Sequence, residues 1–348
     1  MKLRDLFTTI LNKTESGQDT VLVTIAAETG SSPRSAGAHM LCAGEGRVWG
    51  TIGGGTLEYR ALELAGELLA RRQSGWERYR LRPNDEEDLG MLCGGDVEVW
   101  FHFIPGGDRD TMRLVEELLR RLERDEDTWL FADLGGSADW TLYSAGQVPE
   151  GLSGDEIRAL ARNRPVLLNS GGRRLYGEPL NFAGKVFIFG GGHVAQALAP
   201  LLDGVDFRCV IFDNREEFVG PERFPTAYRL VTGDYNNIAH SVEVGPRDYL
   251  VIMTHAFDIP VLRQLINKDW AYLGLIGSRG KIAAVKQRLS SEGVDGKKLD
   301  RLSAPIGMRI HSETPAEIAI SIAGELILRR AEMRERLGDA PRINRSGS

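Results

Sequence analysis

The stretch VFIFGGGHVAQALA, Val186 to Ala199, decides the fold of the second half of the chain. Apolar residues lead into a glycine turn, and apolar residues at helical spacing follow it, which predicts a strand, a tight turn and a helix. The turn matches the pattern G-x-G-x-x-A at Gly190, Gly192 and Ala195. In dinucleotide-binding folds the first glycine permits the turn, the second lets a phosphate approach the backbone, and the third position packs the helix on the strand. The stretch therefore predicts a phosphate-binding strand–helix unit.

Strands and helices alternate after this turn, which predicts a Rossmann-like parallel sheet. Asp213 closes the second strand, where a ribose-binding carboxylate is expected. Arg215, close by, leaves a 2′-phosphorylated dinucleotide possible. The expected strands are 185–189, 208–212, 228–231, 249–253 and 272–276. Because ligands bind at the carboxyl ends of parallel strands, the expected ligand-facing residues are Gly190, Gly191, Gly192, His193, Asp213, His255, Ser278, Arg279 and Lys281.

The first region, residues 1–105, predicts an α+β domain. Its expected elements are strand 20–27, a hairpin of 38–42 and 47–52, helix 57–72 and strand 97–104. The loop Gly53-Gly54-Gly55 could hold a second anionic group through backbone N–H groups. Cys93 stands beside Gly94 and Gly95, where an accessible thiolate would suit a soft metal or sulfur. Cys42 and Cys209 lie in expected strands and are interpreted as packed core residues.

Three further segments complete the expected organisation. Residues 106–181 form a connecting α/β segment with a helix at 113–124. Residues 182–338 form the Rossmann-like domain, whose last helix opens at Thr314-Pro315-Ala316-Glu317 with a capping box. Residues 339–348 are expected to be a disordered tail.

The composition narrows the class of protein. With 348 residues, 42% hydrophobic and 26% charged, the chain is expected to be a soluble globular protein of two to three domains. Its net charge of -6 argues against a nucleic-acid partner, which requires a basic face. The sequence shows neither a signal-peptide pattern nor a membrane span. Three scattered cysteines without a CxxC pair fit a reducing cytoplasm.

Seven segments in order resemble the XdhC/CoxI family of xanthine dehydrogenase accessory factors. They are ETGSSPRSAGAHML, GTIGGGTLEYRAL, LGMLCGGDVEVWF, KVFIFGGGHVAQALA, IFDNREEFVGPERFP, LGLIGSRGK and PIGMRIHSETPAEIAISIAGEL. The resemblance covers both ends of the chain and omits the middle.

The resemblance implies a cofactor chaperone more than an enzyme. Such proteins bind the molybdenum cofactor, support its sulfuration with a cysteine desulfurase, and deliver it to a molybdenum hydroxylase such as xanthine dehydrogenase. They form homodimers or larger assemblies. Cys93 would be the residue that meets the cofactor and its metal, while the Rossmann-like domain would hold a nucleotide or the phosphate end of the pterin. Some members carry a cysteine in the first glycine loop, where this chain has Thr56, so Cys93 would act alone.

Two other functions remain open from the residues. One is an NAD(P)-dependent oxidoreductase, for which only His255 and His193 offer themselves as acid–base groups. The other is a nucleotide-sensing module that transfers no cofactor. The residues alone therefore give two anion-binding domains and one candidate thiolate.

Overall fold

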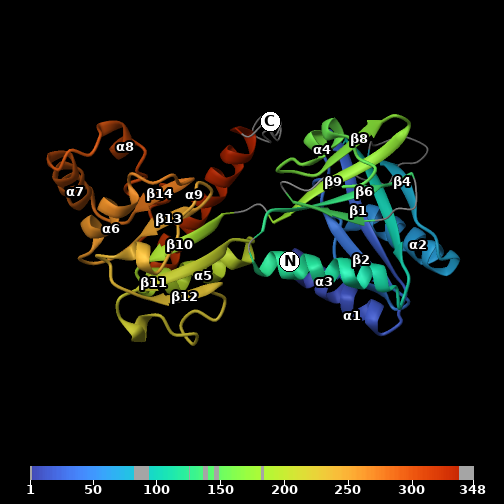
Figure 1. Cartoon of the computed structure of the whole chain (residues 1–348), viewed down its shortest axis with the longest axis horizontal. Coiled ribbons are helices and arrows are strands. Elements are labelled where there is room, and N and C mark those ends of the chain that lie inside the picture. Colours follow the sequence, from blue (N-terminus) through green and yellow to red (C-terminus); the bar gives the residue numbers. More distant parts are fainter. Residues whose placement is uncertain are drawn as a thin grey trace. The chain divides into compact units, whose positions relative to one another are not determined.

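The chain folds into two compact units, Met1–Phe182 and Ala183–Ser348. The structure is a computed structural model that describes residues 2–81, 94–124, 126–135, 140–144, 149–181 and 184–336. Figure 1 colours the first unit from blue to green and the second from yellow to red. Residues 106–181, set apart in the sequence as a connecting segment, pack within the first unit. The expected tail at 339–348 lies outside the described residues.

The first unit contains two antiparallel sheets. The first sheet has the order β3-β2-β1-β5-β4, with β1 at Thr20–Thr29, β2 at His39–Ala43, β3 at Gly46–Gly50, β4 at Gly75–Arg80 and β5 at Asp96–Ile104. The second has the order β7-β6-β9-β8, with β6 at Thr128–Asp133, β7 at Trp140–Tyr143, β8 at Val166–Ser170 and β9 at Arg173–Asn181. Its helices are α1 at Leu3–Glu15, α2 at Gly55–Arg71, α3 at Arg109–Glu123 and α4 at Gly154–Leu160.

Strand β1 is apolar on both faces because each face is covered. Side chains alternate between the faces of a strand, so Val21 and Val23 belong to the cluster that includes Leu57 of α2. Leu22, which points the other way, belongs to the cluster that includes Phe7 of α1 and Tyr176 of β9. The second sheet therefore completes the core of the first unit.

The sequence did not indicate β9, because Gly177 and Pro179 read as strand breakers. In the structure, a Cβ on Gly177 would lie 2.9 Å from both the Cβ and the carbonyl oxygen of Leu160, the last residue of α4. The glycine therefore allows α4 to approach the strand closely. Pro179 pairs with Trp129 beside a register shift, where a missing N–H is tolerated.

The second unit is a parallel sheet with the order β12-β11-β10-β13-β14. Its strands are β10 at Lys185–Phe189, β11 at Arg208–Asp213, β12 at Arg229–Thr232, β13 at Tyr249–Ile252 and β14 at Tyr272–Leu275. Its helices are α5 at His193–Gly204, α6 at Asp258–Leu265, α7 at Arg279–Ser291, α8 at Gly296–Asp300 and α9 at Pro315–Arg336, with 3-10 turns at Glu216–Phe218 (η1) and Ile238–His240 (η2). The strand order reverses at β10, as in a doubly wound fold, so the expected Rossmann-like sheet is confirmed.

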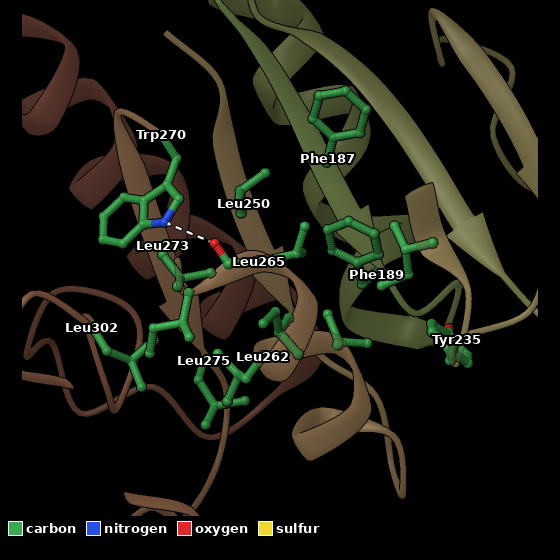
Figure 2. Close-up of a cluster of buried hydrophobic side chains, with 14 of the residues drawn as sticks. Phe187, Phe189, Tyr235, Leu250, Leu262, Leu265, Trp270, Leu273, Leu275 and Leu302 are labelled. Carbon is green, nitrogen blue, oxygen red and sulfur yellow. Dashed lines mark hydrogen bonds between the residues drawn. The ribbon is translucent and has the colours of Figure 1, made fainter. Parts of the chain in front are cut away.

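Two hydrophobic cores cover the two faces of this sheet. Phe187 and Phe189 face the cluster that contains Leu262 of α6, shown in Figure 2 with the hydrogen bond from the Trp270 indole to the carbonyl of Leu265. The alternate residues of β10 pack with α5 and α9 on the other face. The capping box that opens α9 is also present, since Thr314 and Glu317 exchange side-chain hydrogen bonds with each other's backbone N–H groups.

Candidate functional site

The glycine turn after β10 has three glycines with three different environments. Gly190 has φ +117°, and a Cβ there would lie 2.7 Å from the carbonyl oxygen of Met253. A Cβ on Gly191 would collide with the carbonyl oxygen of Phe218. Beside Gly192, which precedes α5, no atom lies within 4 Å of the Cβ position. The first two glycines are therefore required by packing, and Gly192 alone leaves room for a ligand to approach the backbone.

The carboxylate of Asp213 supports this turn from β11. It is 1% exposed, and its Oδ2 accepts a 2.9 Å hydrogen bond from the backbone N–H of Gly191. Arg215 donates to it through its backbone N–H at 3.1 Å and through Nε and Nη2, each at 3.0 Å. Burial opposes ionisation, but these hydrogen bonds outweigh it, so the pKa of Asp213 is lowered. The expected ribose-binding carboxylate is thus ionised and engaged within the protein.

The loops after β13 and β14 meet beside the glycine turn. A Cβ on Gly190 would lie 3.3 Å from the N of Thr254, whose carbonyl oxygen is 3.4 Å from Nζ of Lys281. The same ammonium lies 2.5 Å from Oδ2 of Asp258, and the hydroxyl of Thr254 donates to Oδ1 of Asp258 at 2.6 Å. Asp258 and Thr254 are both buried. They lie in the loop that the sequence placed at this edge, although only His255 of that loop was expected to face the ligand.

The segment Gly277-Ser278-Arg279-Gly280-Lys281 orients this lysine. A Cβ on Gly277 would lie 2.9 Å from Cδ of Lys281, so the glycine makes room for the lysine stem. Ser278 caps α7 by accepting the N–H of Lys281 at 3.3 Å. Arg279 is exposed. Lys281 is therefore held in place by an acid, and Arg279 is available to a ligand.

His193 and His255 are exposed at this carboxyl edge of the sheet. Among the described residues, neither makes a side-chain hydrogen bond, so no carboxylate orients either imidazole as in a catalytic dyad. The structure therefore brings every expected residue of the second unit to one edge, but it pairs neither histidine for acid–base work.

Three loops converge at one end of the first unit. A Cβ on Gly30 would lie 3.1 Å from Cα of Gly95, and one on Gly53 would lie 2.6 Å from Cβ of Pro33. We call residues 30–34, 52–55 and 94–95 the three-loop cluster. It also contains Arg34, an exposed cation whose Cγ lies 3.4 Å from the Cβ position of Gly53. Arg34 ends the segment Ser31-Ser32-Pro33-Arg34, and nothing in the sequence indicated that this arginine lies beside the glycine loop.

Glu58 of α2 supports the 52–55 loop of this cluster, and the sequence did not single it out. Its Oε2 accepts hydrogen bonds from the backbone N–H groups of Ile52 at 3.2 Å and Gly54 at 3.1 Å, and from the hydroxyl of Thr51. Its Oε1 accepts one from Arg47 at 2.5 Å. Burial disfavours the charge, but these hydrogen bonds dominate and the pKa of Glu58 is lowered. A carboxylate of the chain therefore already occupies the first N–H groups of the glycine loop.

The thiols divide into two buried residues and one outside the described residues. Burial raises the pKa of Cys42 and of Cys209 to about 12, so both are protonated and poor metal ligands. In the described part of the chain, no group of three or more histidine, cysteine or acidic residues could hold a metal ion. Cys93 directly precedes Gly94, whose N–H donates to the carbonyl of Leu81 at 2.8 Å, but Cys93 itself lies outside the described residues. The described donor set thus fits an anionic ligand and not a metal bound by protein ligands alone.

These two units define a class of protein: an α+β unit with a glycine-loop cluster and a Rossmann-like unit with a glycine turn at the carboxyl edge of its sheet. The XdhC and CoxI family model matches residues 14–80, and the model of the XdhC Rossmann domain matches residues 186–326. The chain belongs to the XdhC and CoxI family.

Curated relatives resemble most of the chain. It is 25% identical to a protein of Bacillus subtilis (strain 168) named as a probable xanthine dehydrogenase subunit, over 91% of this chain and 94% of that protein. It is 24% identical to the molybdenum cofactor insertion chaperone PaoD of Escherichia coli (strain K12), over 92% of this chain and 86% of that protein. It is also 25% identical to the uncharacterized protein YqeB of the same strain, over 93% of this chain. The chain spans about half of YqeB, at 46% of its length.

A solved structure has the same fold. The crystal structure of a xanthine dehydrogenase from Bacillus halodurans matches with a TM-score of 0.78, 23% sequence identity and 98% coverage of both chains. Within the described residues, no helix is both long enough and apolar enough to cross a bilayer.

Proposed function

We propose that this protein is an accessory factor that binds the molybdenum cofactor and delivers it to xanthine dehydrogenase or a related molybdenum hydroxylase. The names of two relatives, a molybdenum cofactor insertion chaperone and a probable xanthine dehydrogenase component, support the cofactor and the partner. The observation that carries the proposal is the three-loop cluster, because the segment that follows Cys93 packs against Gly30, and the loop that contains Gly30 also packs against Gly53.

The cargo would be held by groups of two kinds. Where the 52–55 loop of the three-loop cluster leads into α2, the N–H groups of Gly55 and Thr56 lack intrahelical acceptors. With exposed Arg34 they would bind a second anionic group of the cofactor. Cys93 would supply a thiolate to the cofactor. The carboxyl edge of the second unit would bind a phosphate with the N–H groups at the start of α5 and with Arg279.

Sulfuration and assembly are further parts of the proposal. Replacement of an oxo ligand of the cargo by sulfur would need a cysteine desulfurase as the sulfur-donating partner. We also propose a homodimer as the working form. The desulfurase would perform the sulfur transfer, and dimer formation is not a reaction. This chain would therefore act as a carrier and need not contribute a catalytic residue.

The geometry favours a carrier over the oxidoreductase alternative. A hydride-transferring enzyme would need Asp213 to bind a ribose and a histidine to move a proton. Asp213 is engaged by Arg215 and Gly191, and the imidazoles of His193 and His255 have no orienting partner among the described residues.

The test is the cofactor content of protein purified from a host that makes molybdenum cofactor. The protein is oxidised, its pterin fluorescence is read and its molybdenum is measured. We expect pterin and metal in the wild type and their loss in Cys93→Ser. Cys42→Ala is the matched control, because its thiol is buried and it should keep both. A wild-type protein without pterin that binds NAD(P) tightly would contradict the proposal and favour the oxidoreductase.

A further inference from the structure

The carboxylate of Asp213 has no acceptor capacity left for a ligand. An ionised carboxylate offers about four lone-pair sites. Four hydrogen bonds reach it, one from the N–H of Gly191 and three from Arg215, and the residue is 1% exposed. A ribose diol that sought this carboxylate would have to displace the guanidinium of Arg215.

One edge of the Arg215 guanidinium, formed by Nε and Nη2, is bound to Asp213, and the Nη1 side remains available. Its Nε and Nη2 face Asp213, while the guanidinium carbon lies 3.7 Å from the centre of the Phe218 ring. Among the described residues, nothing accepts a hydrogen bond from Nη1. A guanidinium held in this way keeps N–H donors in a fixed plane, which suits the tetrahedral oxygens of a phosphate.

A second guanidinium lies against the same ring. The Cζ atom of Arg223 is 5.0 Å from the centre of Phe218, and Arg223 is exposed. The carbonyl of Phe218 packs on Gly191 of the glycine turn. In the described structure, neither arginine pairs with Glu216, Glu217 or Glu222. Two cations therefore stand beside the turn where ligands of Rossmann-like sheets bind.

We propose that Arg215 and Arg223 make the carboxyl edge of the second unit specific for a phosphomonoester, and that Arg215 excludes an unmodified ribose diol by occupying Asp213. The phosphomonoester is either the phosphate end of a pterin cofactor or the 2′-phosphate of a dinucleotide. Only the pterin source rests on the proposed function. Asp213 is then a positioning residue that acts through Arg215.

Two matched pairs of probes test the specificity on the full chain by titration calorimetry. The first pair is NADP⁺ and NAD⁺, which differ by the 2′-phosphate. The second is the oxidised pterin derivative of the cofactor with and without its phosphate. We expect the phosphorylated member of at least one pair to bind about 10- to 100-fold more tightly, as for the loss of one or two charge-assisted contacts.

The result identifies the source of the phosphate. Preference within the first pair only would indicate a 2′-phosphorylated dinucleotide, and preference within the second only would indicate the pterin. No preference in either pair, or tighter binding of NAD⁺ than of NADP⁺, would overturn the inference. The pterin and molybdenum content of purified protein judges the proposed function separately, since it requires only that the cofactor be bound.

Single substitutions distinguish the contributions of Arg215 and Arg223 to ligand binding. Arg223→Ala changes an exposed side chain and should weaken the preferred probe about 10-fold. Arg215→Ala should weaken it at least as much and should let NAD⁺ bind, because Asp213 becomes available to a ribose. Arg263→Ala is the matched control, since Arg263 of α6 pairs with Glu292, which follows α7, and its removal should leave binding unchanged. Unchanged binding by folded Arg223→Ala would contradict the role of that residue.

Discussion

The two glycine loops of this protein look alike in sequence but are completed differently. The loop at Gly53–Gly55 has Glu58, which accepts two backbone N–H groups and a hydroxyl. The turn at Gly190–Gly192 has Asp213, which accepts a single backbone N–H of that turn, from Gly191. A chain carboxylate thus fills much of the first loop, whereas the second keeps its helix N-terminus and the open side of Gly192 for a ligand. Glycine spacing shows where N–H groups converge, and the nearby carboxylates decide how many remain available.

The largest expected effect is on the first loop. Glu58→Ala should lower the free energy of unfolding of the first unit by about 3 kcal/mol, because buried donors lose their acceptor. Urea unfolding followed by tryptophan fluorescence measures this, since five of the six tryptophans lie in the first unit. Glu67→Ala is the control, because its exposed side chain pairs only with Arg71 of the same helix. Equal stability of the two variants would show that Glu58 does not support the loop.

The second expected effect is a difference in stability between substitutions at Gly190 and at Gly192. Gly190→Ala should destabilise the β10–α5 region by about 2–3 kcal/mol, because φ is positive and the methyl group would meet the carbonyl of Met253. Gly192→Ala should leave the stability nearly unchanged. Hydrogen exchange of peptides spanning residues 185–205 measures both. Gly192→Val should abolish ligand binding in a folded protein, and normal binding by this variant would contradict a role for the turn as a phosphate site.

The third effect is the pH dependence that Asp213 imposes. Its folded pKa is lowered, so its stabilisation is fully present above the unfolded value of about 3.9 and is lost as the pH falls through the folded value. Asp213→Asn should therefore cost about 1–2 kcal/mol at pH 7. The cost should be smaller at pH 3, which lies below the unfolded pKa. Urea midpoints at pH 7, 5 and 3 measure this difference, with the exposed Glu243→Gln as control. A difference that stays constant with pH would rule out the ionised carboxylate as its origin.

The smallest expected effect concerns the two buried thiols, Cys42 and Cys209, which should not react with a labelling reagent in the folded protein. With thiol pKa values of about 12, Cys42 and Cys209 should resist a thiol reagent at pH 8 in the folded protein. Cys93→Ser should therefore show almost no labelling until it is denatured, when two thiols react. Rapid labelling of folded Cys93→Ser would mean that one of the two strands opens readily.

The sequence by itself determined the parallel sheet, the glycine turn and the capping box of α9. These signals are local, because strand periodicity, a tight turn and a cap each depend on neighbouring residues. Glu58 stands four residues from Gly54, whereas Asp213 stands 22 residues from Gly191, and the role of each depends on which way its side chain turns.

Only the tertiary structure decided how many donors of each loop remain free. The contact of Gly95 with the loop after β1, the approach of α4 to Gly177 and the pairing of Lys281 with Asp258 each join residues that are distant in the chain. Such contacts depend on how elements pack, and residue spacing along the chain does not encode them. The family and the fold could therefore be predicted from the sequence, whereas the engagement of Asp213 by Arg215, which bears most directly on the ligand, became visible only in the folded chain.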